Sequence, residues 1–542
     1  MKIGIDLDNT IISYDEAFLS VAKKEGMIDE RFEGSKNDVK QLIQENYGEI
    51  DWQMLQGLVY GKYIHEAKIF KGFKRFIWRC HFQGVSVQVI SHKTEYGHQD
   101  KERISLRKAA IDFLDKNKLI NDSYGKMFKN IDFASTRDEK IEKINEQSFD
   151  WFIDDLHEVI FHKNIDDSIN KILFSGFMNF KKERVVNLSH WDQIEKKILG
   201  PFSEKEIMQI TLDNLNKKAL SSIWIGGRGN SGIYKVTLPD KKHIALKIYS
   251  YKRKHSNLYA EFEGSKKIIE GKINNLPTPI NANIDFNLAY FEWVDGEHIL
   301  KSNTIHLDKA MSFLSKLHLL REKDSFIDFP RASAACFSGR DIELQLKQRI
   351  NNLFEAKDHS EELREYLTNE LEPFIKIAID WSKDNWGKLA DFDRELSKNN
   401  LTLSPSDFGF HNVLIKDDDE LVFHDFEYFG WDDPVKLIVD FSLHPAMNLN
   451  QETIVKWFDG TVKIYGRNII PRLKAAWPLY ALCWTLIYLN EFRDDVWERR
   501  VFANPDKIKA REIILKQQLN SSKALLTKIR NNYNDNKIIG NL

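Results

Sequence analysis

Cysteine is scarce in this chain of 542 residues, which contains only Cys80, Cys336 and Cys483. The three lie far apart in the sequence and match neither a disulfide framework nor the ligand spacing of a metal site. We therefore expect them to be reduced and structural, as in a cytoplasmic protein.

The chain also lacks an excess of charge and a long apolar run. Its 79 basic and 81 acidic residues give a formal net charge of −2, and this balance argues against nucleic acid as a partner. The longest apolar run, residues 475–489, is interrupted by Pro478 and is too short to cross a bilayer. Because the N-terminus enters a strand-like segment at once, we expect no signal peptide and no membrane partner. The sequence leaves the oligomeric state open.

A chain of this length exceeds what one hydrophobic core usually holds, so we expect two or three domains. Gly200 and Pro201 end a helix-like segment and are typical of a turn or loop. We therefore place a first domain at residues 1–200, followed by a smaller part at 201–300 and a larger, helical part at 301–542.

Polar side chains follow three apolar, strand-like segments of the first domain, residues 2–7, 85–90 and 151–153. In a doubly wound α/β sheet, sites form at the carboxyl ends of strands, so we expect these side chains to meet. Two carboxylates spaced two residues apart can take separate roles in phosphoryl transfer. One attacks phosphorus as the nucleophile, and the other donates and accepts a proton. The alternative is a Rossmann-like domain whose acids have no catalytic role. The side chains concerned are Asp6, Asp8, Thr10, Ser91, Asp154 and Asp155.

Together with Lys140, in a helix-like segment, this ordered set resembles the haloacid dehalogenase (HAD) superfamily. The resemblance implies a Rossmann-like α/β domain, and the aspartate at position 8 favours a Mg²⁺-dependent phosphatase over a dehalogenase. Lys143 is an alternative to Lys140, because the sequence does not fix the register of the helix. Residues 13–73 predict a small helical cap that gates the site. The implied roles are Asp6 as nucleophile, Asp8 as acid and base, Thr10, Ser91 and Lys140 as phosphate-binding residues, and Asp6, Asp8, Asp154 and Asp155 as metal ligands.

A glycine-rich turn between two strand-like segments, residues 226–232, opens the second part of the chain. Glycine lets backbone N–H groups approach phosphates closely, so Gly227, Gly229 and Ser231 are candidate ATP-binding residues. The turn is not a Walker loop, because no Gly-Lys-Ser/Thr sequence opens a helix here. An ordinary β-turn is the alternative interpretation.

Lys247 lies on the predicted strand 243–249, and a helix-like segment supplies Glu261 and Glu263 shortly afterwards. A strand lysine held by a helix glutamate is the arrangement that contacts the α- and β-phosphates of ATP in kinases. We prefer Glu261 over Glu263, because Ile268 lies seven residues after Glu261 and falls on the same helix face.

The next strand-like segment, residues 287–294, predicts a strand and hinge against which adenine packs. The backbone groups of Glu292 and Val294 would contact the base there. An ordinary strand that ends in a turn is the alternative.

Asp407 and Asn412 lie in a loop-like segment, and a strand, an acidic turn and a second strand lead from them to Asp425. A hairpin of this kind would aim the three side chains at one point. Kinase-type transfer needs an Asp that accepts the hydroxyl proton, and an Asn and an Asp that hold Mg²⁺ on the phosphates. The alternative is a polar hairpin whose Asp and Asn only form turns.

These residues, followed by Glu427 and then Asp432, Asp433, Pro434 and Asp440, resemble the catalytic segment of the aminoglycoside phosphotransferase/choline kinase-like family. The resemblance implies a bilobal, protein-kinase-like α+β fold, with residues 201–300 as the nucleotide lobe. It also implies Asp407 as catalytic base, and Asn412 and Asp425 as metal ligands. Pro405 departs from the family, which commonly has His at this position, so the substrate cannot be carried over.

The two resemblances together predict a bifunctional enzyme that uses Mg²⁺ and ATP. Its partners would be a small phosphorylated substrate for a phosphatase and a small hydroxyl acceptor for a kinase. One hypothesis is sequential work on a sugar or polyol, as in making precursors of surface polysaccharides. One alternative is that a single domain is catalytic and the other is a ligand-binding or nucleotide-sensing module. Another is a nucleic-acid end-processing enzyme, which the balanced charge disfavours.

Overall fold

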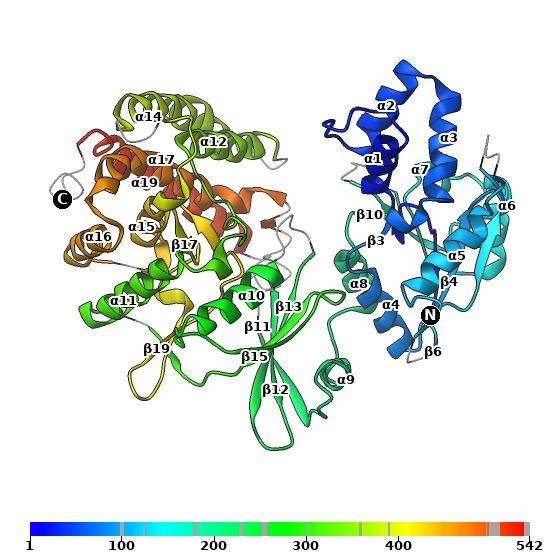
Figure 1. The fold of residues 1–542 in the computed structure, drawn as a ribbon, viewed down its shortest axis with the longest axis horizontal. Helices are drawn as coiled ribbons and strands as arrows, with labels where there is room; N and C mark the ends of the chain where they lie inside the picture. The colour runs from blue at the N-terminus through cyan, green and yellow to red at the C-terminus, as the bar shows by residue number, and fades with distance from the viewer. Residues whose placement is uncertain are drawn as a thin grey trace. The chain divides into compact units, whose positions relative to one another are not determined.

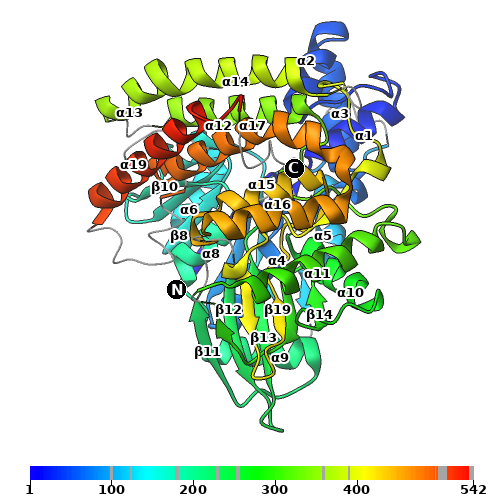
Figure 2. The same cartoon turned by 90° about the vertical axis from the view of Figure 1, so that its left-hand side faces the viewer.

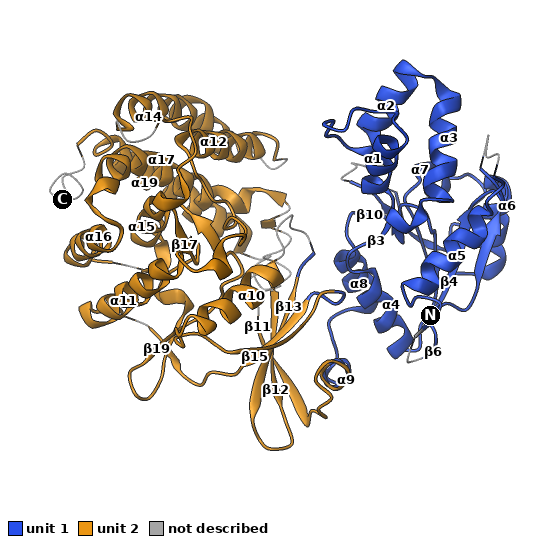
Figure 3. Cartoon of the chain, viewed as in Figure 1, with its two compact units in different colours: residues 1–210, 250–252, 285–287 blue, residues 211–249, 253–284, 288–542 orange. Residues whose placement is uncertain are grey.

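A computed structural model of the chain combines helices with parallel and antiparallel sheets, so the predicted mixed α/β character is confirmed (Figure 1). The chain divides into two compact units (Figure 3). The first unit comprises residues 1–210, 250–252 and 285–287, and the second comprises residues 211–249, 253–284 and 288–542. The structure describes residues 1–97, 102–122, 125–176, 182–226, 231–251, 257–299, 301–356, 360–387, 391–447, 449–494, 496–497 and 510–535.

The first unit is built on a parallel sheet of six described strands in the order β10-β9-β8-β1-β4-β7. Phe152 packs into the hydrophobic core on one face of the sheet, and its neighbour Ile153 packs into the core on the other. Strands covered on both faces are continuously apolar, as these are. The strands are β1 (Lys2–Ile5), β4 (Ser86–His92), β7 (Ile131–Ala134), β8 (Trp151–Asp154), β9 (Asn170–Phe174) and β10 (Val185–Leu188).

Helices connect these strands, and the three strands predicted from the sequence are confirmed as β1, β4 and β8. The helices of this layer are α4 (Phe73–Phe82), α5 (Leu106–Lys116), α6 (Arg137–Gln147), α7 (His157–Ile160) and α8 (Trp191–Leu199).

Three helices form a group of their own between β1 and α4 (Figure 1). A two-stranded ribbon of β2 (Ile12–Ser13) and β3 (Lys68–Ile69) closes the insertion where it leaves and rejoins the sheet domain. The helices pack on one another through aromatic side chains, including Phe18 stacked on Trp52 at 5.0 Å. They are α1 (Asp15–Lys24), α2 (Lys36–Asn46) and α3 (Glu49–Tyr60).

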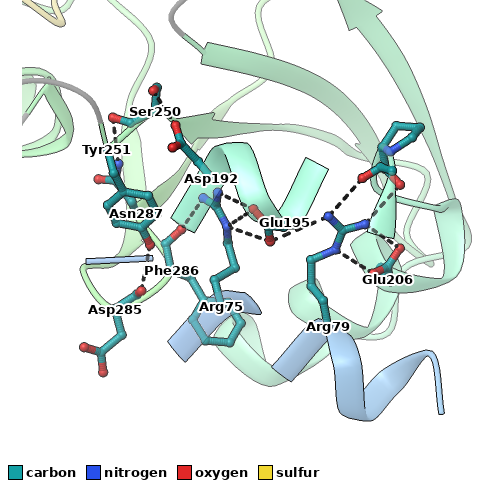
Figure 4. A network of polar contacts seen from close by, with 12 residues as sticks. Arg75, Arg79, Asp192, Glu195, Glu206, Ser250, Tyr251, Asp285, Phe286 and Asn287 are labelled. Carbon is teal, nitrogen blue, oxygen red and sulfur yellow. Dashed lines mark hydrogen bonds and ion pairs between the residues drawn. The ribbon is translucent and has the colours of Figure 1, made fainter. Parts of the chain in front are cut away.

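Two buried arginines of α4 organise a polar network inside the first unit (Figure 4). Arg75 donates to both carboxylate oxygens of Glu195 on α8, with its Nη2 2.6 Å from Oε2. Its Nη1 donates to the carbonyl oxygen of Phe286 at 3.0 Å, so the segment 285–287 belongs to the network. Asp192 of α8 accepts a hydrogen bond from the Ser250 hydroxyl at 2.7 Å.

Arg79 ties the end of α8 to the start of α9 (Glu204–Leu215). Its Nε lies 2.7 Å from Glu206 Oε1, and its Nη groups donate to the carbonyl oxygens of Gly200 and Pro201. Glu206 also accepts the Ser203 N–H at 2.8 Å and completes a capping box at the first turn of α9. The first unit therefore continues past residue 200, the expected boundary, to residue 210.

The second unit begins with an antiparallel sheet of five described strands in the order β11-β12-β13-β15-β14. The predicted strand 243–249 is confirmed as β13. Helix α10 (Asn257–Glu270) packs on β14 and β15. The strands are β11 (Ser221–Gly226), β12 (Ser231–Thr237), β13 (His243–Tyr249), β14 (Pro279–Asn283) and β15 (Leu288–Glu292).

Two small sheets follow and carry the predicted hairpin. One joins β16 (Glu297–His298), β18 (Val413–Ile415) and β19 (Leu421–Phe423), and the other pairs β17 (Thr402–Ser404) with β20 (Gly430–Asp432). Because β17 pairs with β20, the two ends of the segment between them, residues 405–429, lie next to each other.

Helices make up the rest of the second unit. Helix α17 packs against α12, α14, α15 and α19 and forms the centre of this helical part (Figure 2). No helix among the described residues is both long enough and apolar enough to cross a membrane. The main helices are α11 (Thr304–Leu320), α12 (Gly339–Phe354), α14 (Glu372–Asn385), α15 (Pro434–Leu443), α16 (Gln451–Tyr465), α17 (Ile470–Tyr488) and α19 (Arg511–Arg530).

The buried ion pair of Arg75 and Glu195 gives a test of the first unit. We expect Arg75→Leu to lower the free energy of unfolding by about 3–5 kcal/mol, because Glu195 keeps a buried charge without its main partner. Hydrogen exchange of first-unit peptides in urea would measure the loss. The control is Lys108→Leu, which breaks an exposed pair with Asp112 and should cost less than about 1 kcal/mol. An equal loss in both variants would contradict this account.

Candidate active sites

A buried lysine joins two carboxylates at the carboxyl ends of β1 and β8. Lys140 Nζ lies 2.5 Å from Asp6 Oδ1 and 2.6 Å from Asp154 Oδ2. Burial by itself would lower the pKa of Lys140, but the two carboxylates outweigh it and raise that pKa above its usual value. Lys143, the alternative from the sequence, lies on a half-exposed face and pairs with Glu139 instead.

Three acids of this site converge closely enough to hold a metal ion. Asp6, Asp154 and Asp155 each present a carboxylate oxygen within 4.8 Å of the others. Burial, followed by the charge of Asp154, raises the pKa of Asp155 to about 7, and burial also raises the pKa of Asp6 well above its usual range. Oxygen ligands of this type fit Mg²⁺, whose charge would relieve the repulsion among the three.

Two buried hydroxyls near the strand ends lack partners among the described residues. Thr10 Oγ1 and Ser91 Oγ are both inaccessible to solvent, and neither makes a hydrogen bond. Leaving a buried hydroxyl unsatisfied costs about 1–3 kcal/mol, so such groups call for a ligand or a water. Both are positions that the sequence assigned to phosphate binding.

Asp8 meets side chains that the sequence analysis did not assign to the site. Its Oδ1 accepts a hydrogen bond from the Tyr14 hydroxyl at 2.8 Å, and its Oδ2 lies 2.8 Å from Lys93 Nζ. The Lys93 ammonium also lies 4.7 Å from the centre of the Tyr60 ring, on α3. Lys93 follows Ser91 by two residues on the same strand end, and this spacing was the one signal that could have identified it.

The helical insertion between β2 and β3 also brings a cation to this region. Lys36, the first residue of α2, donates to the side-chain oxygen of Asn9 at 3.2 Å. Burial is the main cause that lowers the pKa of Lys36. The insertion therefore contributes Tyr14, Lys36 and Tyr60 to the surroundings of the catalytic candidates.

In the second unit, Lys247 of β13 joins acids from two distant segments. Its Nζ lies 2.7 Å from Glu261 Oε2 on α10 and 2.6 Å from Asp425 Oδ1. A third carboxylate, Glu427, lies 3.7 Å away. The structure thus brings Glu261 to the lysine, together with Tyr249, whose hydroxyl donates to Glu261 at 2.7 Å.

In this cluster, burial and the charge of Lys247 shift the pKa values of the carboxyl groups in opposite directions. Burial raises the pKa of Glu261 to about 7 even though Lys247 pulls it down. For Asp425, burial is outweighed by the Lys247 charge, which holds the pKa below its usual value. Gly264 lets α10 pack closely against Phe429, because a Cβ at this position would lie 2.5 Å from the Phe429 ring.

Asp407 and Asn412 lie together in the loop between β17 and β18. Asn412 Nδ2 donates to the Asp407 carbonyl oxygen at 3.0 Å, which leaves the Asn412 side-chain oxygen available as a metal ligand. Burial would raise the pKa of Asp407, but the hydrogen bond and charge of His411 hold it below its usual value. The side chain of Asp407 is 38% exposed, so an acceptor can reach it.

Of the remaining predicted ATP-binding residues, the structure describes Ser231, Glu292 and Val294. Gly227 and Gly229 lie outside the described residues, and Ser231 is the first residue of β12. Glu292 ends β15, where its N–H donates to the Thr278 carbonyl oxygen and its side chain accepts from the Thr278 hydroxyl. Val294 follows as a half-buried residue outside the strand.

Asp432, Asp433 and Asp440 accept hydrogen bonds that connect β20 and α15 to other segments of the second unit. Asp433 accepts two hydrogen bonds of 2.9 Å from Arg472 on α17, and Asp440 accepts one of 2.8 Å from Trp484. Asp432 accepts the backbone N–H groups of Cys336 and Asp433. Burial raises the pKa of Asp432 to about 7 despite the nearby Lys436.

No protein-family model and no curated protein matches this chain. The solved structures that are similar to about 60% of the chain include three with TM-scores below 0.5, which carry no functional argument of their own. They are a spectinomycin phosphotransferase with ADP and spectinomycin (11% identity, 60% of this chain and 99% of that one, TM-score 0.43), a choline kinase from Cryptosporidium parvum Iowa II (14%, 60% and 99%, 0.37) and an ethanolamine kinase from Plasmodium vivax (13%, 59% and 94%, 0.38).

The raised pKa of Asp432 predicts a pH dependence of stability. Because its folded pKa of about 7 exceeds the unfolded value, the folded state binds an extra proton, and this stabilisation is lost as the pH rises through 7. Asp432→Asn keeps the acceptor oxygen but cannot ionise. We expect the stability of the wild type relative to Asp432→Asn to fall by at most about 1.4 kcal/mol per pH unit between pH 5 and 7. Urea midpoints of the second unit would show this, and a difference independent of pH would contradict it.

Proposed function

We propose that the second unit is an ATP-dependent kinase that phosphorylates a hydroxyl group of a small molecule. The observation that carries this proposal is the contact of Lys247 with both Glu261 and Asp425, whose segments are far apart in the sequence. In kinase-type phosphoryl transfer, such a lysine contacts the phosphates and such an aspartate faces the metal.

Each residue then has a role set by its surroundings. Lys247 binds the α- and β-phosphates, and Glu261 fixes the direction of its ammonium group. Asn412 and Asp425 would hold Mg²⁺, which neutralises charge on the phosphates when bound. Asp407 accepts the proton of the acceptor hydroxyl, for which its lowered pKa keeps it deprotonated near neutral pH.

The acceptor belongs to the class of small hydroxyl compounds, and sugars and polyols are the acceptors that we propose to test first. The solved structures that are similar to this chain include enzymes whose names specify spectinomycin, choline and ethanolamine. Those compounds extend the acceptor panel without identifying the substrate of this chain.

Asp407→Asn gives the direct test of the kinase. We expect kcat for phosphoryl transfer from ATP to fall by about 10²–10⁴-fold, because the side chain can no longer accept the hydroxyl proton. ADP formation over the acceptor panel would be measured, and nucleotide binding would be measured separately. Asp6→Asn is the matched control and should leave transfer unchanged. A wild type that binds ATP but spends it on no acceptor would instead indicate a nucleotide-sensing module.

We also propose a second activity, a Mg²⁺-dependent phosphatase of the HAD type in the first unit. The observation that favours it is the cluster of Asp6, Lys140 and Asp154 at the carboxyl ends of β1 and β8. The buried hydroxyls of Thr10 and Ser91 have no hydrogen-bond partner among the described residues, and such donors suit the oxygens of a phosphate monoester.

The reaction would run in two steps. An Asp6 oxygen attacks phosphorus and the bond to the leaving oxygen breaks, while Asp8 gives that oxygen its proton. Asp8, now a carboxylate, takes a proton from a water molecule that attacks the aspartyl phosphate and regenerates Asp6. Lys93 pairs with this carboxylate form of Asp8, and Asp154 and Asp155 would hold Mg²⁺ together with Asp6.

Asp6→Asn tests the phosphatase by removing its nucleophile. We expect phosphate release from phosphosugars and phosphopolyols to disappear, while ADP formation by the second unit continues. Lys143→Ala provides the matched control, since Lys143 contacts Glu139 and should leave phosphate release within about twofold of wild type. Phosphate release that survives in Asp6→Asn would place the activity elsewhere.

A further inference from the structure

Asp407 faces a pair of histidines that the sequence did not connect with it. His411 Nε2 lies 3.0 Å from Asp407 Oδ1, and His444 Nε2 lies 4.0 Å from the same oxygen. The two imidazole rings are stacked, with centroids 4.0 Å apart and planes only 6° from parallel. Two histidines therefore face Oδ1 of the proposed base, and Oδ2 of the same carboxylate takes part in neither contact.

Hydrogen bonds around the rings indicate which nitrogens carry protons. The Ala446 N–H donates to His444 Nδ1 at 3.2 Å, so neutral His444 carries its proton on Nε2, the nitrogen that faces Asp407. His411 Nδ1 is buried without a partner among the described residues, and its Nε2 faces an ionised carboxylate, which can only accept. Both histidines therefore present Nε2–H groups to Asp407.

The same geometry argues against a metal ion at this cluster, although Asp407, His411 and His444 each offer a ligand atom. A metal-bound imidazole holds the ion close to its ring plane, and two parallel stacked rings cannot both do so for one ion. A metal-bound histidine also donates its other ring N–H, whereas His444 Nδ1 accepts a hydrogen bond here.

The second histidine is itself held from several sides. His444 follows the last turn of α15, and its N–H donates to the Asp440 carbonyl oxygen at 3.0 Å. The Trp484 ring meets the His444 ring edge-on at 5.0 Å, and Trp484 donates to Asp440. Helices α15 and α17 thus fix the ring on which His411 stacks.

We propose that His411 is a positioning residue for the base, with His444 as its support. His411 donates its Nε2–H to Asp407 Oδ1 and fixes the carboxylate so that Oδ2 points at the acceptor hydroxyl. His444 holds the His411 ring by stacking. This inference rests on the proposed kinase function of the second unit.

Kinetics of His411 variants test the proposal. We expect His411→Ala to lower kcat about 10²-fold with little change in the KM for ATP, because a misplaced base affects transfer rather than nucleotide binding. His411→Gln places an amide N–H near the position of Nε2 and should recover at least about tenfold of that loss. His444→Ala should give an intermediate loss. The control is His65→Gln, an exposed residue of the first unit, which should keep wild-type values.

Two kinetic results would overturn the proposal: an unchanged kcat in His411→Ala, or a His411→Gln variant no better than His411→Ala. A loss that falls equally on kcat and on ATP binding would also overturn it, since it would indicate a general disturbance of the fold.

A second measurement separates this proposal from the kinase function itself. Nitrogen NMR of histidine-labelled full-length protein, assigned with single variants, reports the tautomer of each ring without any turnover. We expect the Nε2–H tautomer for His411 and His444, and a change in the His411 Nε2–H signal in Asp407→Ala. An Nδ1–H tautomer at either residue would refute the positioning role. If no acceptor is phosphorylated but the tautomers are as expected, the kinase function fails and the contact with Asp407 stands.

Discussion

Each unit depends on one buried lysine that holds carboxylates from distant parts of the chain. Lys140 bridges Asp6 and Asp154 in the first unit, and Lys247 bridges Glu261 and Asp425 in the second. Carboxylates of like charge repel one another in a poorly solvated place, and the ammonium makes their approach possible. The strand ends, helices and hairpins around each lysine are arranged so that these acids arrive together.

Such clusters are poor sources of stability, because taking charges out of water costs about as much as their attraction returns. For the proposed reactions their value would be preorganisation, because groups of fixed direction and charge can meet a phosphate without rearranging. The Arg75–Glu195 pair differs from these clusters, because it matches one cation with one anion and joins α4 to α8. In the lysine clusters acids outnumber the cation, and burial raises the pKa values of Asp6, Asp155 and Glu261. An excess of buried negative charge is what a divalent cation would relieve.

Several parts of the structure could be predicted because local patterns report them. The apolar runs that became β1, β4 and β8 lead into polar residues at their ends, and the run that became β13 carries Lys247 within the strand. The helix face shared by Glu261 and Ile268 follows from helical periodicity. The register that separates Lys140 from Lys143 did not follow from the sequence, because both lie on one helix and only the sheet decides which one turns inward.

The sequence by itself determined which residue types stand at strand ends and in the loop after β17, because each is set by neighbours a few positions away. Only the tertiary structure decided which distant groups surround them: Lys93, Tyr14 and Lys36 near Asp8 and Asn9, and His444 stacked on His411 beside Asp407. These contacts join segments whose approach depends on how whole helices pack, and no local pattern encodes that packing. His411 and His444 lie 33 positions apart in sequence, and the end of α15 brings their rings to 4.0 Å.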